Sequence, residues 1–390
     1  MFRLLVLTVL WLLAAASSHP LLRPKQGCPP FGNGTINIAS YQLYPENVDF
    51  DEQSYIGSLY NASVVVYDPY KASVVSTLEF PNITRTPPFH IGGVAWDPYS
   101  GSRDEITILV DAAAAHETAG RDVSGDNYLL RYSTTQNRTL WFTNLTALSR
   151  GRYGGPQDIE HDDAGNTYVL GTYPGTLTRV SSRTGEASEW YIPTSSNRTI
   201  DHAIAGYTGL AAVGNGSSTL LVADARNHSA SGGALYRFDM SALRGTPTRV
   251  PIAYPNANTN SSGAGEEEEE GVIRPGDAIY LPQRYGGAVL LITEHEAGVS
   301  VLRSRVEDDD KKGKGNEWRR AEFLGRIPNP PEITASGGVV TAAVEIAGSV
   351  YMVEEWFTDP LVPGTSAGNR TSFPLVDITL QLDALVNAAS

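Results

Sequence analysis

Residues 154–180 constrain the fold most, because three short extended segments alternate there with turn residues. Asp, Gly and Asn supply the turns, and β-branched and aromatic side chains fill the segments between them. With the following segment, the predicted strands are residues 156–160, 167–170, 176–180 and 189–192. They form an antiparallel meander. One meander cannot bury both of its faces alone, whereas several packed radially can.

The same alternation of predicted strands and turns recurs six times along the chain. Glycine-containing starts recur at Gly92, Gly154, Gly206, Gly276 and Gly337. The sixth copy supplies three strands, the last of them residues 374–382, and residues 35–43 are a strand left over at the other end. Pairing this strand with the sixth copy would close the ring and hide two edges. The sequence therefore predicts an all-β fold, a six-bladed β-propeller with four antiparallel strands per blade, closed by an N-terminal strand. A seven-bladed count is the alternative.

The first 34 residues read as a targeting segment and an arm. Arg3, an apolar run at residues 4–13 and small residues at 14–18 predict a cleavable secretory signal over residues 1–18. An N-terminal arm follows at residues 19–34, and the propeller is predicted over residues 35–386. No later segment has the length of a membrane span. We therefore expect a chain that is secreted or resides in the lumen of the secretory pathway.

Asn-x-Ser/Thr sequons support this route. They are Asn33, Asn61, Asn82, Asn137, Asn144, Asn197, Asn215, Asn227, Asn260 and Asn369. Cys28 is the only cysteine, so no disulfide can form within the chain. The net charge of −14 argues against nucleic acid as a partner, because phosphates require a basic surface. Residues 256–271, with their run of glutamates, and residues 308–314 are expected to be exposed loops.

Antiparallel strands bring distant residues to one end of the ring. In each blade the start of the innermost strand and the loop after the second strand lie at the same end. Five of the seven histidines map to this end, and His161 maps to the opposite one. Histidine, acidic and aromatic side chains together are typical of a small-molecule site, although loop ends are polar in any case. The predicted binding residues are His90, Trp96, Asp111, Asp158, Tyr173, His202, Tyr207, Asp224 and Trp356.

Several common chemistries are missing from the sequence. His116-Glu117 and His295-Glu296 both lack the second histidine of a zinc protease, and neither a G-x-S-x-G elbow nor a phosphate-binding loop is present. Four acids that end second strands could in principle hold a cation, namely Asp111, Asp224, Glu294 and Glu354. Such acids more often cap loops, so we predict neither a metal nor a cofactor.

Five stretches resemble a family of secreted fungal propellers. They are QLYPENVDFD (42–51), YIGSLYNASVVVYD (55–68), HIGGVAWD (90–97), ILVDAAAAHETAGRDVSGDNYLLRY (108–132) and YGGPQDIEHDDAGNTYVLGTYP (153–174). That family includes the trichothecene-cluster secreted protein, the Malassezia propeller allergen and the hetero-Diels–Alderases of tropolone sesquiterpenoid pathways. The resemblance implies a six-bladed fold and a hydrophobic small-molecule ligand, but no single activity.

Three functional hypotheses follow. The first is a cofactor-independent hetero-Diels–Alderase, since members similar to the tropolone enzymes would dehydrate a benzylic alcohol to a quinone methide and guide its cycloaddition with a terpene. Its candidate catalytic residues are His295, Glu294, His116 and Glu354. The second is a binding protein without catalysis, tied to toxin biosynthesis or virulence or to lipid binding. The third is a lactonase or esterase with a channel metal. Sequons predicted near the ring mouth would crowd a broad protein interface and favour a small ligand.

Overall fold

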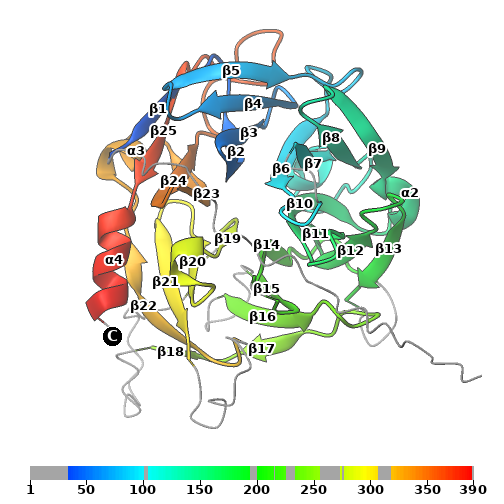
Figure 1. The fold of residues 1–390 in the computed structure, drawn as a ribbon. Helices are drawn as coiled ribbons and strands as arrows, with labels where there is room; N and C mark the ends of the chain where they lie inside the picture. The colour runs from blue at the N-terminus through cyan, green and yellow to red at the C-terminus, as the bar shows by residue number, and fades with distance from the viewer. Residues whose placement is uncertain are drawn as a thin grey trace, which may run out of the picture.

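Six β-sheets surround a central axis (Figure 1). This computed structural model describes residues 34–100, 104–193, 200–214, 216–224, 233–254, 273–274, 276–305 and 318–388. Each sheet is one blade, so the predicted six-bladed propeller is confirmed. The signal, nearly all of the arm, Cys28 and both predicted exposed loops lie outside the described residues.

The blades follow the order of the chain. Blade 1 contains β2 (Pro45–Asp51), β3 (Gln53–Ser58), β4 (Ser63–Asp68) and β5 (Ser73–Leu78). Blade 2 contains β6 (His90–Trp96), β7 (Glu105–Asp111), β8 (Tyr128–Ser133) and β9 (Arg138–Asn144). Blade 3 contains β10 (Gly154–His161), β11 (Thr167–Tyr173), β12 (Thr176–Val180) and β13 (Ala187–Tyr191). Blade 4 contains β14 (Tyr207–Ala212), β15 (Thr219–Asp224), β16 (Ala234–Asp239) and β17 (Thr248–Val250).

The last two blades borrow a strand from elsewhere. Blade 5 contains β19 (Ile279–Tyr280), β20 (Val289–Thr293), β21 (Val299–Ser304) and β22 (Ala321–Ile327), and β18 (Ile252–Ala253) adds to it in parallel. Blade 6 contains β23 (Val339–Ile346), β24 (Ser349–Glu355), β25 (Ser372–Asp377) and β1 (Ile36–Ala39). The short helices α1 (Ala114–Glu117), α2 (Leu145–Ser149), α3 (Pro331–Ala335) and η1 (Gln283–Tyr285) lie in loops.

The N-terminal strand closes the ring as predicted. β1 pairs antiparallel with β25, with Ile36 opposite Leu375 and Ala39 opposite Ser372. Beyond β1, the side-chain amide of Gln42 donates to the carbonyl oxygen of Gly368 at 2.8 Å. The first and last described strands of the propeller are therefore held together by sheet pairing and by loop contacts.

The prediction of one strand over residues 374–382 is wrong in its second half. β25 ends at Asp377, and α4 (Thr379–Ala388) follows on the outside of the ring (Figure 1). The carboxylate of Asp377 accepts from the backbone N–H of Thr379 at 2.9 Å and so stabilises the start of the helix. Ile378 and Leu382 are buried against blades 5 and 6, which explains why the chain turns back there.

Hydrophobic cores lie between neighbouring blades. Along β20, Val289 and Leu291 join the cluster shared with blade 6, whereas Leu290 and Ile292 join the cluster shared with blade 4. Because successive side chains in a strand point to opposite faces, a strand that is apolar throughout must be covered on both sides. Radial packing of six sheets satisfies this requirement.

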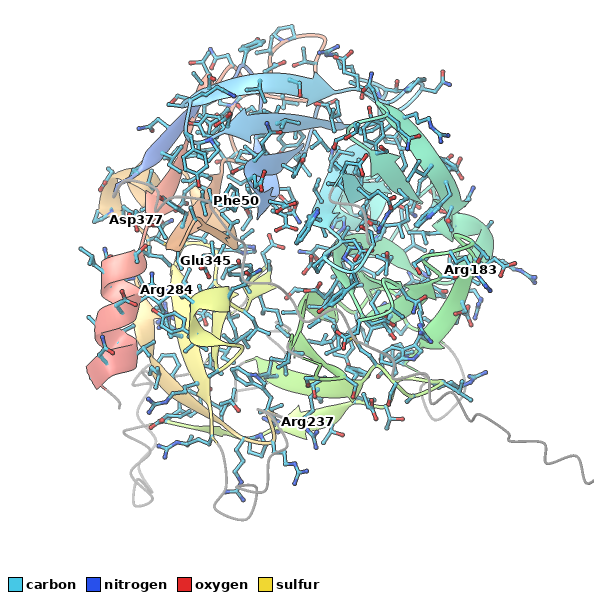
Figure 2. All side chains as sticks on the ribbon, in the orientation of Figure 1. Phe50, Arg183, Arg237, Arg284, Glu345 and Asp377 are labelled. Atoms are coloured by element: carbon cyan, nitrogen blue, oxygen red, sulfur yellow. The ribbon has the colours of Figure 1, made fainter. Side chains whose placement is uncertain are left out.

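Side chains also join the innermost strands from blade to blade. Asp49 accepts from the backbone N–H of Trp96 at 2.6 Å, and Glu160 accepts from that of Ala212 at 3.1 Å. Figure 2 shows Phe50 and Glu345 on the inner part of the ring, with Arg183 and Arg237 on its rim. Within the described residues, no helix has the length and apolar character needed to cross a membrane.

Candidate functional site

The residues predicted to meet at one end of the ring do so through strand register. His90, the first residue of β6, pairs with Asp111, the last of β7, and Tyr207 pairs with Asp224 in the same way in blade 4. The connections that contain α1, α2 and α3 lie at this end. We call it the loop-rich end.

β-bulges recur near the start of the innermost strands. The strand register shifts between Pro45 and Val48 in β2 and between Pro156 and Asp158 in β10, and β6, β14 and β23 carry equivalent shifts. A bulge leaves one residue unpaired and redirects its side chain. Glu46 and Gln157 occupy such positions.

A polar chain crosses from blade 3 to blade 5 at the loop-rich end. The Thr172 hydroxyl donates to Gln157 Oε1 at 2.6 Å, and the Gln157 amide donates to Asp277 Oδ1. Asp277 Oδ2 lies 3.5 Å from His295 Nε2. The hydrogen bond that His295 donates to Asp277 raises the pKa of His295 and so favours its imidazolium form.

His295 combines exposure with backbone strain. Its side chain is 43% exposed, and its φ is 43°, in the left-handed region that is uncommon for residues other than glycine. Its carbonyl oxygen accepts from the backbone N–H of Val340 at 3.1 Å, which ties it to blade 6. His295 thus combines a strained backbone that is held on both sides with a proton donor that is partly exposed, and this combination suits a catalytic residue.

A second group of side chains lies over blades 2 and 3. The exposed ring of His116, on α1, meets Tyr173 edge to face with 5.7 Å between centroids. Tyr173 is buried with Ala115 and Val123. His202 Nδ1 donates to the carbonyl oxygen of Gly120 at 2.7 Å, which identifies Nδ1 as the protonated nitrogen.

Comparison with known proteins identifies the family. Trichothecene biosynthesis protein 14 of Trichoderma arundinaceum is 31% identical over 377 residues, which are 93% of this chain and 92% of that protein. The chain belongs to the family of trichothecene biosynthesis protein 14. Core trichothecene cluster protein 14 of Fusarium sporotrichioides is 29% identical over 376 residues, 92% of this chain and 88% of that protein. No family model matches the sequence.

Solved structures support the fold. The major allergen Mala s 1 of Malassezia sympodialis superposes with a TM-score of 0.64 at 17% identity, over 90% of this chain and 96% of the allergen. The sequence resemblance to trichothecene-cluster proteins and to the Malassezia propeller is thus confirmed. At this identity the allergen bears on architecture alone.

Two of the predicted catalytic acids are not equivalent. Glu294 is 1% exposed, and its oxygens already accept from Arg326 Nε at 2.6 Å, the Ser300 hydroxyl at 2.7 Å and the backbone N–H of Arg274 at 2.9 Å. Both of its oxygens are therefore already engaged. Glu354 is fully buried, and its carboxyl oxygens make no hydrogen bond of good geometry within the described residues, although the Asn329 amide lies near.

The predicted binding acids mainly hold backbone. Asp158 accepts from the N–H of Leu210 at 2.9 Å and so joins blades 3 and 4, and burial raises its pKa to about 8. Asp111 accepts from the N–H of Ala113 at 2.7 Å. Asp224 is buried at the end of β15.

The predicted aromatic walls lie in several places. Tyr207 stacks on Tyr191 at 5.9 Å within the core between blades 3 and 4. Trp356 is 2% exposed and lies under the Arg370 guanidinium, 4.0 Å from its ring centroid. Trp96 ends β6 at the opposite end of the ring from His90. The structure therefore brings five of the predicted residues to the loop-rich end. His90, His116, His202 and His295 are at least partly exposed there, and Tyr173 contacts His116.

Sequence reasoning maps Asp277 and Glu355 to this end without choosing them as site residues, and it misses Glu46 and Tyr60, which the structure also places here. The signal was available, because Glu46 begins the innermost strand of blade 1 and Tyr60 follows its second strand, the same rule that selected His90 and Asp111. Within the described residues, no three His, Cys, Asp or Glu side chains are arranged to hold a metal ion.

Five sequons fall in the described part of the chain. Asn82, Asn137, Asn144 and Asn369 are exposed. The Asn61 amide nitrogen, which a glycan would occupy, donates to the carbonyl oxygen of Gln42 at 2.8 Å. The other five sequons lie outside the described residues.

Proposed function

We propose that this member of the trichothecene-cluster family binds a hydrophobic small molecule at the loop-rich end and transfers a proton to it from His295. The His295–Asp277 pair carries the proposal, because it joins an exposed imidazole to a carboxylate that favours its charged form. The relatives are named for trichothecene biosynthesis, which supports a natural product as the ligand.

Loss of water from an ortho-hydroxybenzyl alcohol is the reaction that we assign to this pair. The imidazolium protonates the benzylic hydroxyl, the C–O bond breaks, and water leaves. The neutral imidazole then accepts the phenolic proton, so a quinone methide forms and His295 ends the turnover as it began. Asp277 stabilises the imidazolium and orients the ring.

Cycloaddition with a terpene alkene would complete a hetero-Diels–Alder type reaction. Bond formation here requires no group from the chain beyond orientation of the two reactants. The buried cluster of Tyr173, Ala115 and Val123 supports the exposed ring of His116, against which a hydrocarbon could lie. No redox cofactor enters this scheme.

The test compares His295→Asn with wild type and with a control. Asparagine tolerates a left-handed backbone, so the variant removes the imidazole with little added strain. The control is Arg183→Gln, an exposed substitution in the loop at the opposite end. Purified protein is incubated with an ortho-hydroxybenzyl alcohol and a cyclic terpene, and adducts are separated by chromatography. We expect a loss of roughly 100-fold for His295→Asn, the lower range for one proton-transfer group.

Product ratios equal to those without protein would remove the catalytic proposal. A second candidate, a binding protein without chemistry, would then stand. It is favoured by the extent to which Glu294 and Asp158 are already engaged by Arg326 and by backbone. This candidate requires that a ligand binds wild type and His295→Asn equally while neither converts it.

We also propose that the chain enters the secretory pathway and carries glycans. The exposed sequons Asn82, Asn137, Asn144 and Asn369 support this, together with the signal-like N-terminal sequence. Expression in a fungal host, followed by treatment with an N-glycosidase, should lower the mass and convert the modified asparagines to aspartate. An unchanged mass would refute the glycan proposal.

A further inference from the structure

Two acidic side chains from different blades come together at the loop-rich end without hydrogen-bond donors for all of their oxygens. Glu46 lies in the bulge of β2, which packs against β23 and β24, and Glu355 ends β24. Glu355 is fully buried, and neither of its carboxyl oxygens makes a hydrogen bond of good geometry within the described residues, although the backbone N–H of Trp356 lies near. Glu46 is 9% exposed, and its Oε2 also has no hydrogen-bond partner within the described residues. Glu46 is therefore the more accessible member of the pair.

The surrounding ionisable groups are predominantly acidic. Asp277, Asp111 and Asp158 all act on Glu46 together with Glu355. Arg370 lies near Glu355, but Asp359 binds it at two nitrogens, with distances of 2.9 and 3.0 Å. Burial, reinforced by these carboxylates, raises the pKa of Glu46 well above its ordinary value. Burial does the same for the pKa of Glu355.

Aromatic side chains cover the pair. Tyr60 contacts both Tyr44 and His90 edge to face, each with 5.3 Å between centroids. Burial raises the pKa of the Tyr60 hydroxyl, and the nearby acids Glu355 and Glu46 add to this effect. Burial lowers the pKa of His90, so this imidazole is neutral. Among the described residues, the surroundings thus supply apolar surface and no cation that is not already bound.

We propose that Glu46, backed by Glu355, is a neutral carboxylic acid that donates a hydrogen bond to an uncharged oxygen acceptor of a terpenoid ligand, such as a ketone or an epoxide. The inference rests on the proposed function for the class of ligand and adds to it the feature that is recognised. An anionic ligand would meet the negative charge of Asp277 and Asp111. A pure hydrocarbon would leave the acid without an acceptor, which penalises its binding.

A matched pair of probes tests this directly. Nootkatone is a sesquiterpene ketone, and valencene is the hydrocarbon of the same skeleton. We expect wild type to bind the ketone about tenfold more tightly, the ratio that one net hydrogen bond provides. Glu46→Gln retains a donor and should keep the preference, whereas Glu46→Met should lose it. Glu52→Gln, at the exposed residue between β2 and β3, makes the same chemical change at the opposite end of the ring and should behave as wild type.

The pH dependence provides a second measurement if Glu46→Met does not fold. The preference for the ketone should disappear in wild type as the pH rises and Glu46 ionises, and it should persist at all pH values in Glu46→Gln. A preference that strengthens with pH, or a Glu46→Gln variant that behaves as Glu46→Met, would show that the ionised carboxylate is the binding form and would overturn the inference.

Infrared spectroscopy separates this inference from the proposed function. At neutral pH wild type should show a carbonyl stretch of a protonated carboxyl group that Glu46→Gln lacks, and absence of that band overturns the inference alone. Equal binding of both probes does the same. Failure of both probes to bind overturns the inference together with the proposed ligand class.

Discussion

Glu354→Gln should stabilise the chain at neutral pH and have little effect in acid. Glu354 is fully buried, and burial raises its pKa from the ordinary value of 4.5 to about 8. Glutamine has the shape of the protonated acid and can still meet the nearby Asn329 amide. The substitution therefore removes a titration while it preserves the packing.

The sign and size follow from proton linkage. Between pH 4.5 and about 8 the folded chain keeps a proton on Glu354 that the unfolded chain releases, so the free energy of unfolding falls as the pH rises. Each pH unit in this window is worth about 1.4 kcal/mol. At pH 7 the deficit is about 3 kcal/mol, and at pH 4 it is close to zero.

Urea unfolding at both pH values measures the effect. The gain in unfolding free energy for Glu354→Gln over wild type should be larger at pH 7 than at pH 4 by about 3 kcal/mol. Glu332→Gln, in α3, makes the same chemical change at an exposed position and should give no difference. A gain that is equal at the two pH values, or a loss at pH 7, would mean that Glu354 is ionised in the folded chain and would refute the reasoning.

Substitutions at Arg326 and at Asp158 test the roles assigned to buried polar groups, and a deletion tests the closure of the ring by β1. Arg326→Met should destabilise by about 3–5 kcal/mol in urea unfolding because it leaves the carboxylate of Glu294 buried without its cation, and a loss below 1 kcal/mol would contradict this role. Asp158→Ala should cost about 1–3 kcal/mol by leaving the N–H of Leu210 unpaired, whereas Asp158→Asn should lose less; equal losses would point to packing instead. Removal of residues 34–39 should expose the edge of β25 and cause aggregation measurable by light scattering, and an unchanged monomer would show that closure is dispensable.

The blades were predictable because their pattern is local. Strands such as β20 are apolar throughout and are bounded by turn residues, so both their length and their burial on two faces can be read from sequence. The pairing of β1 with β25 was also predictable, since an unpaired strand at each end of a six-unit repeat has one obvious partner. The rule that the start of one strand meets the end of the next placed His90 beside Asp111.

The terminal helix shows where this reasoning fails. Residues 374–382 alternate enough to resemble a strand, but Ile378, Leu382 and Leu385 also recur with helical spacing. The helix forms because these residues pack on blades 5 and 6, and because the carboxylate of Asp377 accepts from the N–H of Thr379 at its start. Both periods fit so short an apolar segment, and tertiary packing decides between them.

The candidate site was only partly predictable. The sequence predicts at which end of the ring a residue lies, but it does not predict which groups its side chain contacts. Glu294 is neutralised by Arg326, which is a strand away, and no local pattern announces that pairing. The ring of Tyr207 enters the core, since its first position in β14 faces blade 3. Asp277 and Gln157 meet across the ring, a contact that depends on the final geometry.

Closure by β1 also imposes an order on assembly. β1 is synthesised first, but its pairing partner β25 is synthesised last. β1 therefore stays unpaired while the first five blades are made. During that interval the edge of blade 6 and the strand meant for it are both open to other chains. The last step of folding is therefore the pairing of β1 with β25. Any contact that holds β1 away from β25 delays closure of the ring.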